Sequence, residues 1–330
     1  IDESRRLSAL GDAYIATKSF ARGLKILREA LKVSAGAARP RVVLAEALVA
    51  AGHDTEAREV LDAVVAARPS DPTLLTRAGQ AFVTLGQPAP AKALLRQALK
   101  VNPTSPTIQL LAAQVALLDG TLPEARKLFR AVLKKEPGHV EAHIALGQIA
   151  VQNKHPRAAQ KHFAAALQQR PKDPKVLEKL ATVFLHLRRW HDAVKHASKA
   201  ISILKKRGDY KRAVELMITL GRGLIPGNRY ARDKAQEILF AASTSAHPPA
   251  RAFYELGRLH RTLRDHSRAI WSFKQAIKRD KTFANAYLQL GLTQRGKRRW
   301  RRQARRNLKR YLALDPKGKH APQVRALLKR

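Results

Sequence analysis

Apolar residues recur along the chain with a helical spacing that repeats every 34 residues. Three apolar residues at spacings of four and three, such as Ala57, Leu61 and Val64, stand ahead of a proline that closes the repeat. The closing prolines follow one another at intervals of 34 residues: Pro69, Pro103, Pro137 and Pro171. Spacings of four and three place side chains on one face of a helix, so these positions predict an amphipathic helix in each repeat.

A second helix is predicted earlier in each repeat, with a small residue where another helix packs closely. These positions alternate between glycine and alanine: Gly11, Ala45, Gly79, Ala113, Gly147 and Ala181. A leucine beside the small residue, as at Leu10, Leu146 and Leu180, is expected to supply apolar contact. One helix pair cannot bury its apolar stripe alone, so neighbouring pairs are expected to stack into a continuous core.

Two repeats carry a pattern that resembles the tetratricopeptide repeat (TPR) family. The fifth repeat matches it with Leu146-Gly147, Ala159, Phe163, Ala166 and Pro171. The eighth repeat matches it with Leu256-Gly257, Ala269, Phe273 and Ala276. The resemblance covers nearly the whole chain, with about nine repeats starting near residues 4, 38, 72, 106, 140, 174, 207, 250 and 284. It implies an all-α fold, a right-handed superhelical solenoid of antiparallel helix pairs whose first helices line a concave groove.

One repeat is irregular, and it divides the chain into three segments. Residues 1–205 are predicted to hold six TPR-like repeats with a near-neutral to apolar groove. Residues 206–249 form a longer repeat, because Pro226-Gly227 interrupts the expected turn and the apolar triplet comes late. Residues 250–330 hold two strongly basic repeats, and the segment 321–329 is predicted to be a helix that caps the solenoid.

Charge is distributed unevenly between the two halves. The 330 residues include 64 lysines and arginines and 25 acids, a net charge of +39. Residues 1–150 hold 20 basic and 14 acidic residues, a net charge of +6, whereas residues 151–330 hold 44 and 11, a net charge of +33. A solvated exterior would not need such asymmetry, so the basic half is interpreted as a working surface.

The densest basic segment runs from Arg295 to Arg310 and contains no acid. Its ten basic residues are Arg295, Lys297, Arg298, Arg299, Arg301, Arg302, Arg305, Arg306, Lys309 and Arg310. On a helix, two neighbouring stripes are expected: Arg301, Arg305 and Lys309, then Arg298, Arg302, Arg306 and Arg310. The opposite side is expected to pack inward through Trp300, Ala304, Leu308 and Tyr311.

A second basic set lies in the preceding repeat. Spacings of three and four place Arg251, Tyr254, Arg258 and Arg261 on one helical face. The TPR resemblance implies that this face lines the groove. The corresponding face of a middle repeat is apolar or neutral, with Thr107, Leu110, Gln114 and Leu117.

Motifs for catalysis or for a cofactor are absent from the sequence. The chain has no cysteine and no GxxxxGK[ST] phosphate loop. His139 and His143 lie four apart, but Glu141 between them does not make an HExxH motif, and packing roles are favoured. We therefore predict no enzyme, no metal site, no cofactor and no small-molecule substrate.

Two kinds of partner fit the basic surface. The TPR resemblance implies a scaffold or adaptor, which here would bind an acidic protein surface or segment. The alternative is a nucleic acid or an anionic membrane surface, bound through the basic half.

No stretch approaches the ~18 consecutive apolar residues of a membrane span, and a cytoplasmic location is predicted. The chain opens on Ile1 without an initiator methionine, which suggests a fragment of a longer protein.

Overall fold

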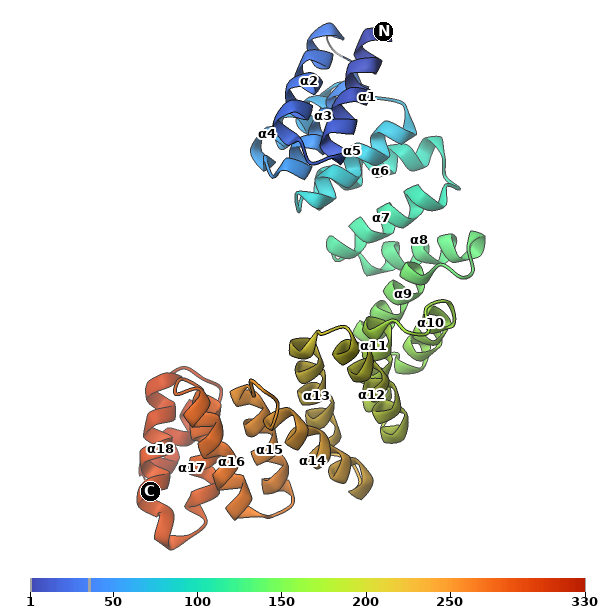
Figure 1. Cartoon of the computed structure of the whole chain (residues 1–330). Coiled ribbons are helices and arrows are strands. Elements are labelled where there is room, and N and C mark those ends of the chain that lie inside the picture. Colours follow the sequence, from blue (N-terminus) through green and yellow to red (C-terminus); the bar gives the residue numbers. More distant parts are fainter. Residues whose placement is uncertain (1, 35–36, 330) are drawn as a thin grey trace. The chain divides into compact units, whose positions relative to one another are not determined.

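The computed structural model describes residues 2–34 and 37–329, and within them the fold is all-α, as predicted. The first helices of successive repeats are α1 (Asp2–Ala16), α3 (Ala38–Ala51), α5 (Pro72–Thr84), α7 (Pro106–Leu118), α9 (Val140–Gln152), α11 (Pro174–His186), α13 (Tyr210–Leu224), α15 (Ala250–Thr262) and α17 (Ala284–Arg295). The second helices are α2 (Phe20–Val33), α4 (Asp54–Ala66), α6 (Pro88–Val101), α8 (Leu122–Lys135), α10 (Pro156–Gln169), α12 (Trp190–Lys206), α14 (Arg229–Ser243), α16 (His266–Arg279) and α18 (Arg301–Leu314). Figure 1 shows these helix pairs in chain order. A 3-10 turn, η1 (Arg298–Trp300), precedes α18, and α19 (Ala321–Lys329) follows α18.

The chain forms two compact units, Ile1–Ile149 and Ala150–Arg330, which are described separately. In both, helix starts agree with the predicted repeat period at all but two places. The first repeat begins at Asp2, two residues earlier than predicted. The seventh begins at Tyr210, three residues later than predicted, because α12 extends to Lys206 and a turn follows it. The proposed division at 205 and 249 stays a prediction.

Local signals fix where the helices begin. Asp71 and Asp173 stand before Pro72 and Pro174, the first residues of α5 and α11. The Asp71 carboxylate accepts a hydrogen bond from the backbone N–H of Thr73 at 2.8 Å, and Asp173 caps α11 in the same way. A capping carboxylate satisfies a free helix donor, and proline at the first position loses no hydrogen bond.

At two of the predicted small residues, Gly11 and Gly79, the two helices of a repeat pack closely against each other. A methyl group on Gly79 of α5 would lie 3.0 Å from Leu95 Cγ of α6, so the glycine permits close packing. The same contact joins Gly221 of α13 to Leu239 of α14, where the methyl group would lie 2.5 Å from the leucine Cγ. The seventh repeat is therefore a normal helix pair with longer helices, 15 residues each.

The cores consist mainly of the predicted alanine, leucine and phenylalanine positions. Phe129 in the first unit and Phe273 in the second are buried, as are Leu146 and Leu180. The prediction for Leu10 is wrong: its side chain is 48% exposed, because no described helix precedes α1 to cover it. At the other end, α19 spans 321–329 as predicted and buries Val324 fully.

Candidate partner-binding site

The ten basic residues from Arg295 to Arg310, here called the arginine cluster, lie on the end of α17, on η1 and on α18. All ten side chains are exposed. Ala304, Leu308 and Tyr311 of α18 are 1–2% exposed, which confirms the predicted inward face. The predicted place of Arg298 is wrong, because the chain forms a 3-10 turn there and α18 begins only at Arg301. The remaining members of both stripes lie on α18 as predicted.

The arginine cluster has no internal neutralisation. Among the described residues, none of its ten side chains lies within 4 Å of a carboxylate. Arg305 instead donates a hydrogen bond from Nη2 to the backbone carbonyl of Leu328 on α19, at 2.8 Å. Like charges four residues apart on a helix repel each other, at a few tenths of a kcal/mol per pair. The cluster therefore presents a strong positive field to the solvent.

The ring of Trp300 lies beside two cations of the arginine cluster. The ring is half-buried and packs against the core that contains Phe273 and Leu290. The guanidinium carbon of Arg299 lies 4.4 Å from the ring centroid, and Lys297 Nζ lies 5.6 Å from it. A ring that is half-buried and already in contact with two cations is a poor stacking platform for bases.

A hollow of about 560 Å³ opens between α17, α18 and α19, beside the arginine cluster. We call it the terminal hollow. Its apolar lining comes from Leu292, Ala304, Leu308 and Leu327. Its charged lining comes from Arg295, Arg301 and Arg305. Its size falls within the ~300–1,000 Å³ of ordinary ligand sites, so it can hold a group such as a large side chain.

The predicted groove set on α15 forms one face. Arg251 and Arg261 are exposed, whereas Tyr254 is half-buried, with its ring centroid 4.9 Å from that of Phe283. Arg258 Nη1 lies 2.8 Å from Glu255 Oε2, and Glu255 is only 3% exposed. Burial raises the pKa of Glu255, while Arg258 opposes the shift. The face is therefore cationic around one buried acid.

The cationic character does not continue evenly to the next first helix. The positions of α17 that correspond to Arg251 and Arg258 are Asn285 and Leu292. Only Arg295, which corresponds to Arg261, is basic. The positive charge of the last repeat thus lies mostly on its second helix.

In the first unit, Leu110 and Leu117 of α7 are half-buried and pack on the core, as expected for an apolar face.

The histidine pair at the start of α9 supports the helix. The backbone N–H of Ala142 donates to His139 Nδ1 at 3.2 Å, and His143 Nε2 lies 2.9 Å from the Pro137 carbonyl. Among the described residues, no group of three or more His, Cys, Asp and Glu side chains is placed to hold a metal ion.

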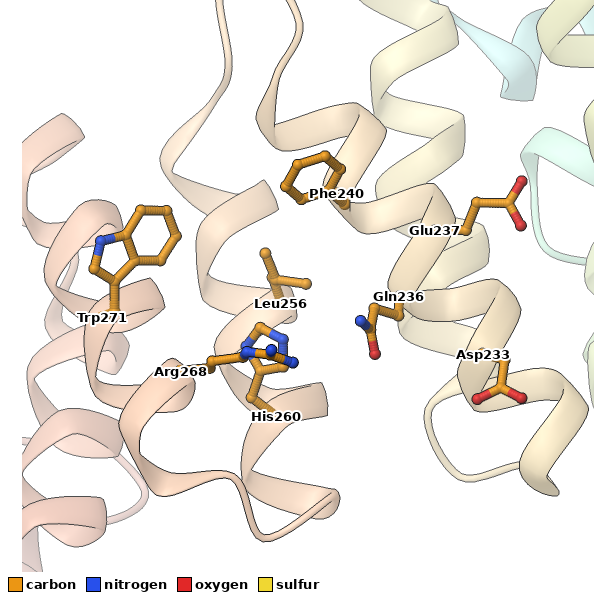
Figure 2. A pocket seen from close by; sticks show the side chains of 8 residues that line it. All are labelled: Asp233, Gln236, Glu237, Phe240, Leu256, His260, Arg268 and Trp271. Atoms are coloured by element: carbon orange, nitrogen blue, oxygen red, sulfur yellow. The ribbon is translucent and has the colours of Figure 1, made fainter.

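A second hollow, of about 600 Å³, was not foreseen from the sequence (Figure 2). We call it the side hollow. Phe240 of α14 and Trp271 of α16 are exposed beside it, and Leu256 and His260 of α15 lie between them. Burial lowers the pKa of His260, so the neutral imidazole is favoured. Both acidic and basic side chains line this hollow, so its charge selects no single sign of partner.

No described helix combines the length and the apolar character that crossing a membrane requires. The predicted cytoplasmic location stays a prediction.

Comparisons with known proteins identify the repeats. One tetratricopeptide repeat model matches residues 14–77 and 116–183, a second matches 76–140, and a third matches 250–283. No curated protein matches the chain.

Three solved structures with a similar fold are distant from this chain in sequence. The type IV pilus biogenesis factor PilW is 16% identical, with a TM-score of 0.55, over 63% of this chain and 94% of PilW. The C-terminal part of a TPR protein from Cytophaga hutchinsonii is 13% identical, with a TM-score of 0.53, over 86% of this chain and 99% of its own length. A TPR protein from Parabacteroides merdae is 15% identical, with a TM-score of 0.50, over 89% and 99%. At these identities the likeness concerns the fold alone.

Proposed function

Because the chain belongs to the tetratricopeptide repeat family, whose members generally act as scaffolds for protein–protein interaction, we propose that it is a non-enzymatic adaptor for an acidic protein partner. The partner binds through the arginine cluster and the cationic face of α15. One observation carries the proposal: ten exposed basic side chains within sixteen residues have no carboxylate within 4 Å among the described residues.

Arginine chemistry favours carboxylates in this setting. A guanidinium presents a planar fork of donors that matches a carboxylate with two parallel hydrogen bonds. The field of the arginine cluster would also steer an acidic surface during encounter, and such charges affect the association rate most. Binding is therefore expected to be fast and to weaken as salt is added, because screening acts on exposed charges.

The first test separates an acidic protein segment from a nucleic acid. Polyglutamate and a random-sequence DNA duplex are offered to the immobilised chain at ~0.15 M salt. We expect polyglutamate to bind, and DNA to bind no tighter than the ~10⁻⁴ M of non-specific contacts. Tighter binding of DNA than of polyglutamate would instead support the nucleic-acid alternative.

The second test locates the surface. In R301E/R302E/R305E/R306E four charges of the arginine cluster are reversed, and we expect at least about a tenfold loss in the association rate of polyglutamate. The matched control reverses four exposed lysines on α12: Lys195, Lys199, Lys205 and Lys206. Both variants change the net charge equally, so an equal loss in both would show that total charge, and not the arginine cluster, governs binding.

The same variants identify the natural partner. Extracts of the native host are treated with nuclease and passed over the wild type and both variants, and retained proteins are identified by mass spectrometry. Acidic proteins retained by the wild type and by the α12 control, but not by the cluster variant, are the expected partners. Retention of the same proteins by all three would contradict the proposed surface.

A further inference from the structure

The terminal hollow occupies a place that the following repeat fills elsewhere in the chain. The repeat register relates α18 to α6 through their buried positions. The corresponding residues are Ala91 and Ala304, Leu95 and Leu308, Lys92 and Arg305, and Arg96 and Lys309. The two helices therefore present the same two basic positions beside the same two buried ones.

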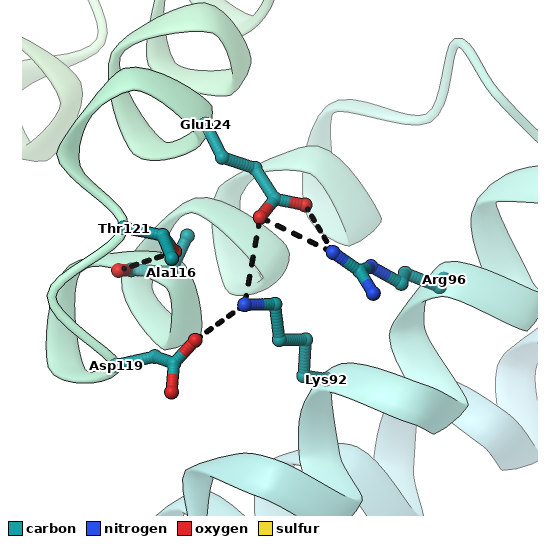
Figure 3. A network of polar contacts seen from close by, with 6 residues as sticks. All are labelled: Lys92, Arg96, Ala116, Asp119, Thr121 and Glu124. Atoms are coloured by element: carbon teal, nitrogen blue, oxygen red, sulfur yellow. Dashed lines mark hydrogen bonds and ion pairs between the residues drawn. The ribbon is translucent and has the colours of Figure 1, made fainter.

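In the earlier repeat, carboxylates of the next repeat cover these cations (Figure 3). Lys92 pairs with Asp119, which follows α7, and its Nζ lies 3.6 Å from Glu124 Oε2 on α8. Arg96 Nη2 lies 3.3 Å from Glu124 Oε1. The space that remains beside Lys92 has a volume of only about 160 Å³. Leu128, four residues after Glu124, lines this space. A carboxylate and an apolar side chain on one face of α8 thus close this place together.

Beside α18 the described chain supplies an apolar side chain, Leu327 of α19, but no carboxylate. The helix that follows, α19, contains no acid, and Arg305 hydrogen-bonds to a backbone carbonyl instead of a carboxylate. The apolar lining from Leu292 and Leu327 remains half-buried, and the space is about 560 Å³.

We propose that the terminal hollow binds an acidic amphipathic helix of a protein partner, with an apolar side chain seated in the hollow. A carboxylate one turn before that side chain would pair with Arg305 or Lys309, as Glu124 does with Lys92 and Arg96. This inference rests on the proposed adaptor function and specifies the segment that the adaptor recognises.

The lining of the terminal hollow selects this occupant over a nucleic acid. Four of its side chains are aliphatic or alanine, and none is aromatic, so it offers no stacking platform for a base. Base edges carry hydrogen-bonding groups, for which Leu292 and Leu327 provide no partner. An aliphatic side chain gives up no hydrogen bond when it enters such a lining, and the three arginines can pair with the acids around it.

The test uses two helical peptides of about 14 residues, rich in glutamate and alanine, with leucine or serine at one position four residues after a glutamate. Binding is measured by fluorescence anisotropy at ~0.15 M salt. For the wild type we expect the leucine peptide to bind at least about tenfold tighter than the serine peptide. In L327W, where the indole fills the hollow, this preference should fall to less than about twofold. In W271A, a matched change at the side hollow, it should remain.

The outcomes separate this inference from the proposed function. Equal binding of both peptides to the wild type would overturn the helix anchor and leave the adaptor function standing, whereas binding of neither would remove both. A leucine preference that survives in L327W would place the anchor elsewhere and overturn the inference. A single-stranded oligonucleotide or a phosphatidylserine vesicle whose binding is lost in L327W, with no leucine preference, would assign the hollow to that ligand instead. Thermal unfolding of L327W by circular dichroism should match the wild type, because Val324 keeps its buried contact.

Discussion

The first unit and the last repeat use exposed basic residues differently. In the first unit, bases on one repeat meet acids on the next: Arg28 on α2 lies 2.7 Å from Glu56 on α4, and Arg96 on α6 lies 3.3 Å from Glu124 on α8. In the last repeat, Lys309 holds the corresponding position on α18, and within the described part of the chain no carboxylate lies within 4 Å of it. The same scaffold position can therefore join two repeats or remain open to a partner, and acids on the neighbouring element decide which.

The difference between the two regions can be assigned to their surface charges only if both regions have equally well-packed cores. Phe129 and Phe273 occupy the same repeat position, and each is at most 1% exposed. We expect F129A and F273A each to lower the free energy of unfolding by about 3–5 kcal/mol, since each leaves a large cavity. Urea denaturation, followed by hydrogen exchange to locate the loss, measures both. A cost below about 1 kcal/mol for F273A alone would mean that the basic repeats are loosely packed, and the comparison would fail.

Charge reversal should change the free energy of unfolding less than the loss of a core phenylalanine, and by different amounts in the two regions. K92E/R96E places like charges beside Asp119 and Glu124, and we expect the free energy of unfolding to fall by about 1–2 kcal/mol. R305E/K309E occupies the corresponding positions of α18, where it relieves repulsion, so we expect no loss beyond about 0.5 kcal/mol. Urea titrations at low and high salt provide the measurement. A larger loss for R305E/K309E would reveal a structural role for these cations.

The sequence predicted the architecture because its determinants are local and repeated. The closing prolines at intervals of 34 residues, the apolar triplet before each of them and the apolar positions of segment 321–329 are all visible as spacings. Arg298 was placed wrongly, because the chain leaves α17 at Arg295 and resumes a helix only at Arg301, and arginine-rich sequence contains no signal for that break.

The hollows could not be predicted, because they depend on distances between elements. The terminal hollow requires α17, α18 and α19 to be positioned together, and the side hollow requires three helices of two repeats. Glu255 offered a partial signal, since it stands three residues before Arg258, but its burial follows from the packing of α15.

The smallest expected effect concerns the acid on the cationic face of α15. Burial raises the pKa of Glu255 above its ordinary 4.5, so its protonated form is favoured in the folded state. The corresponding contribution to stability is present below pH 4.5 and is lost as the pH rises through the folded-state pKa. E255Q should remove this pH dependence and change the free energy of unfolding at pH 7 by less than about 1 kcal/mol, because Arg258 remains partly exposed. Urea titrations of both proteins from pH 4 to pH 8 measure the difference, with E56Q in the exposed pair of the first unit as the control. If E255Q retained the wild-type pH profile, Glu255 would not be the titrating group, and its carboxylate would stay ionised beside Arg258 over this pH range.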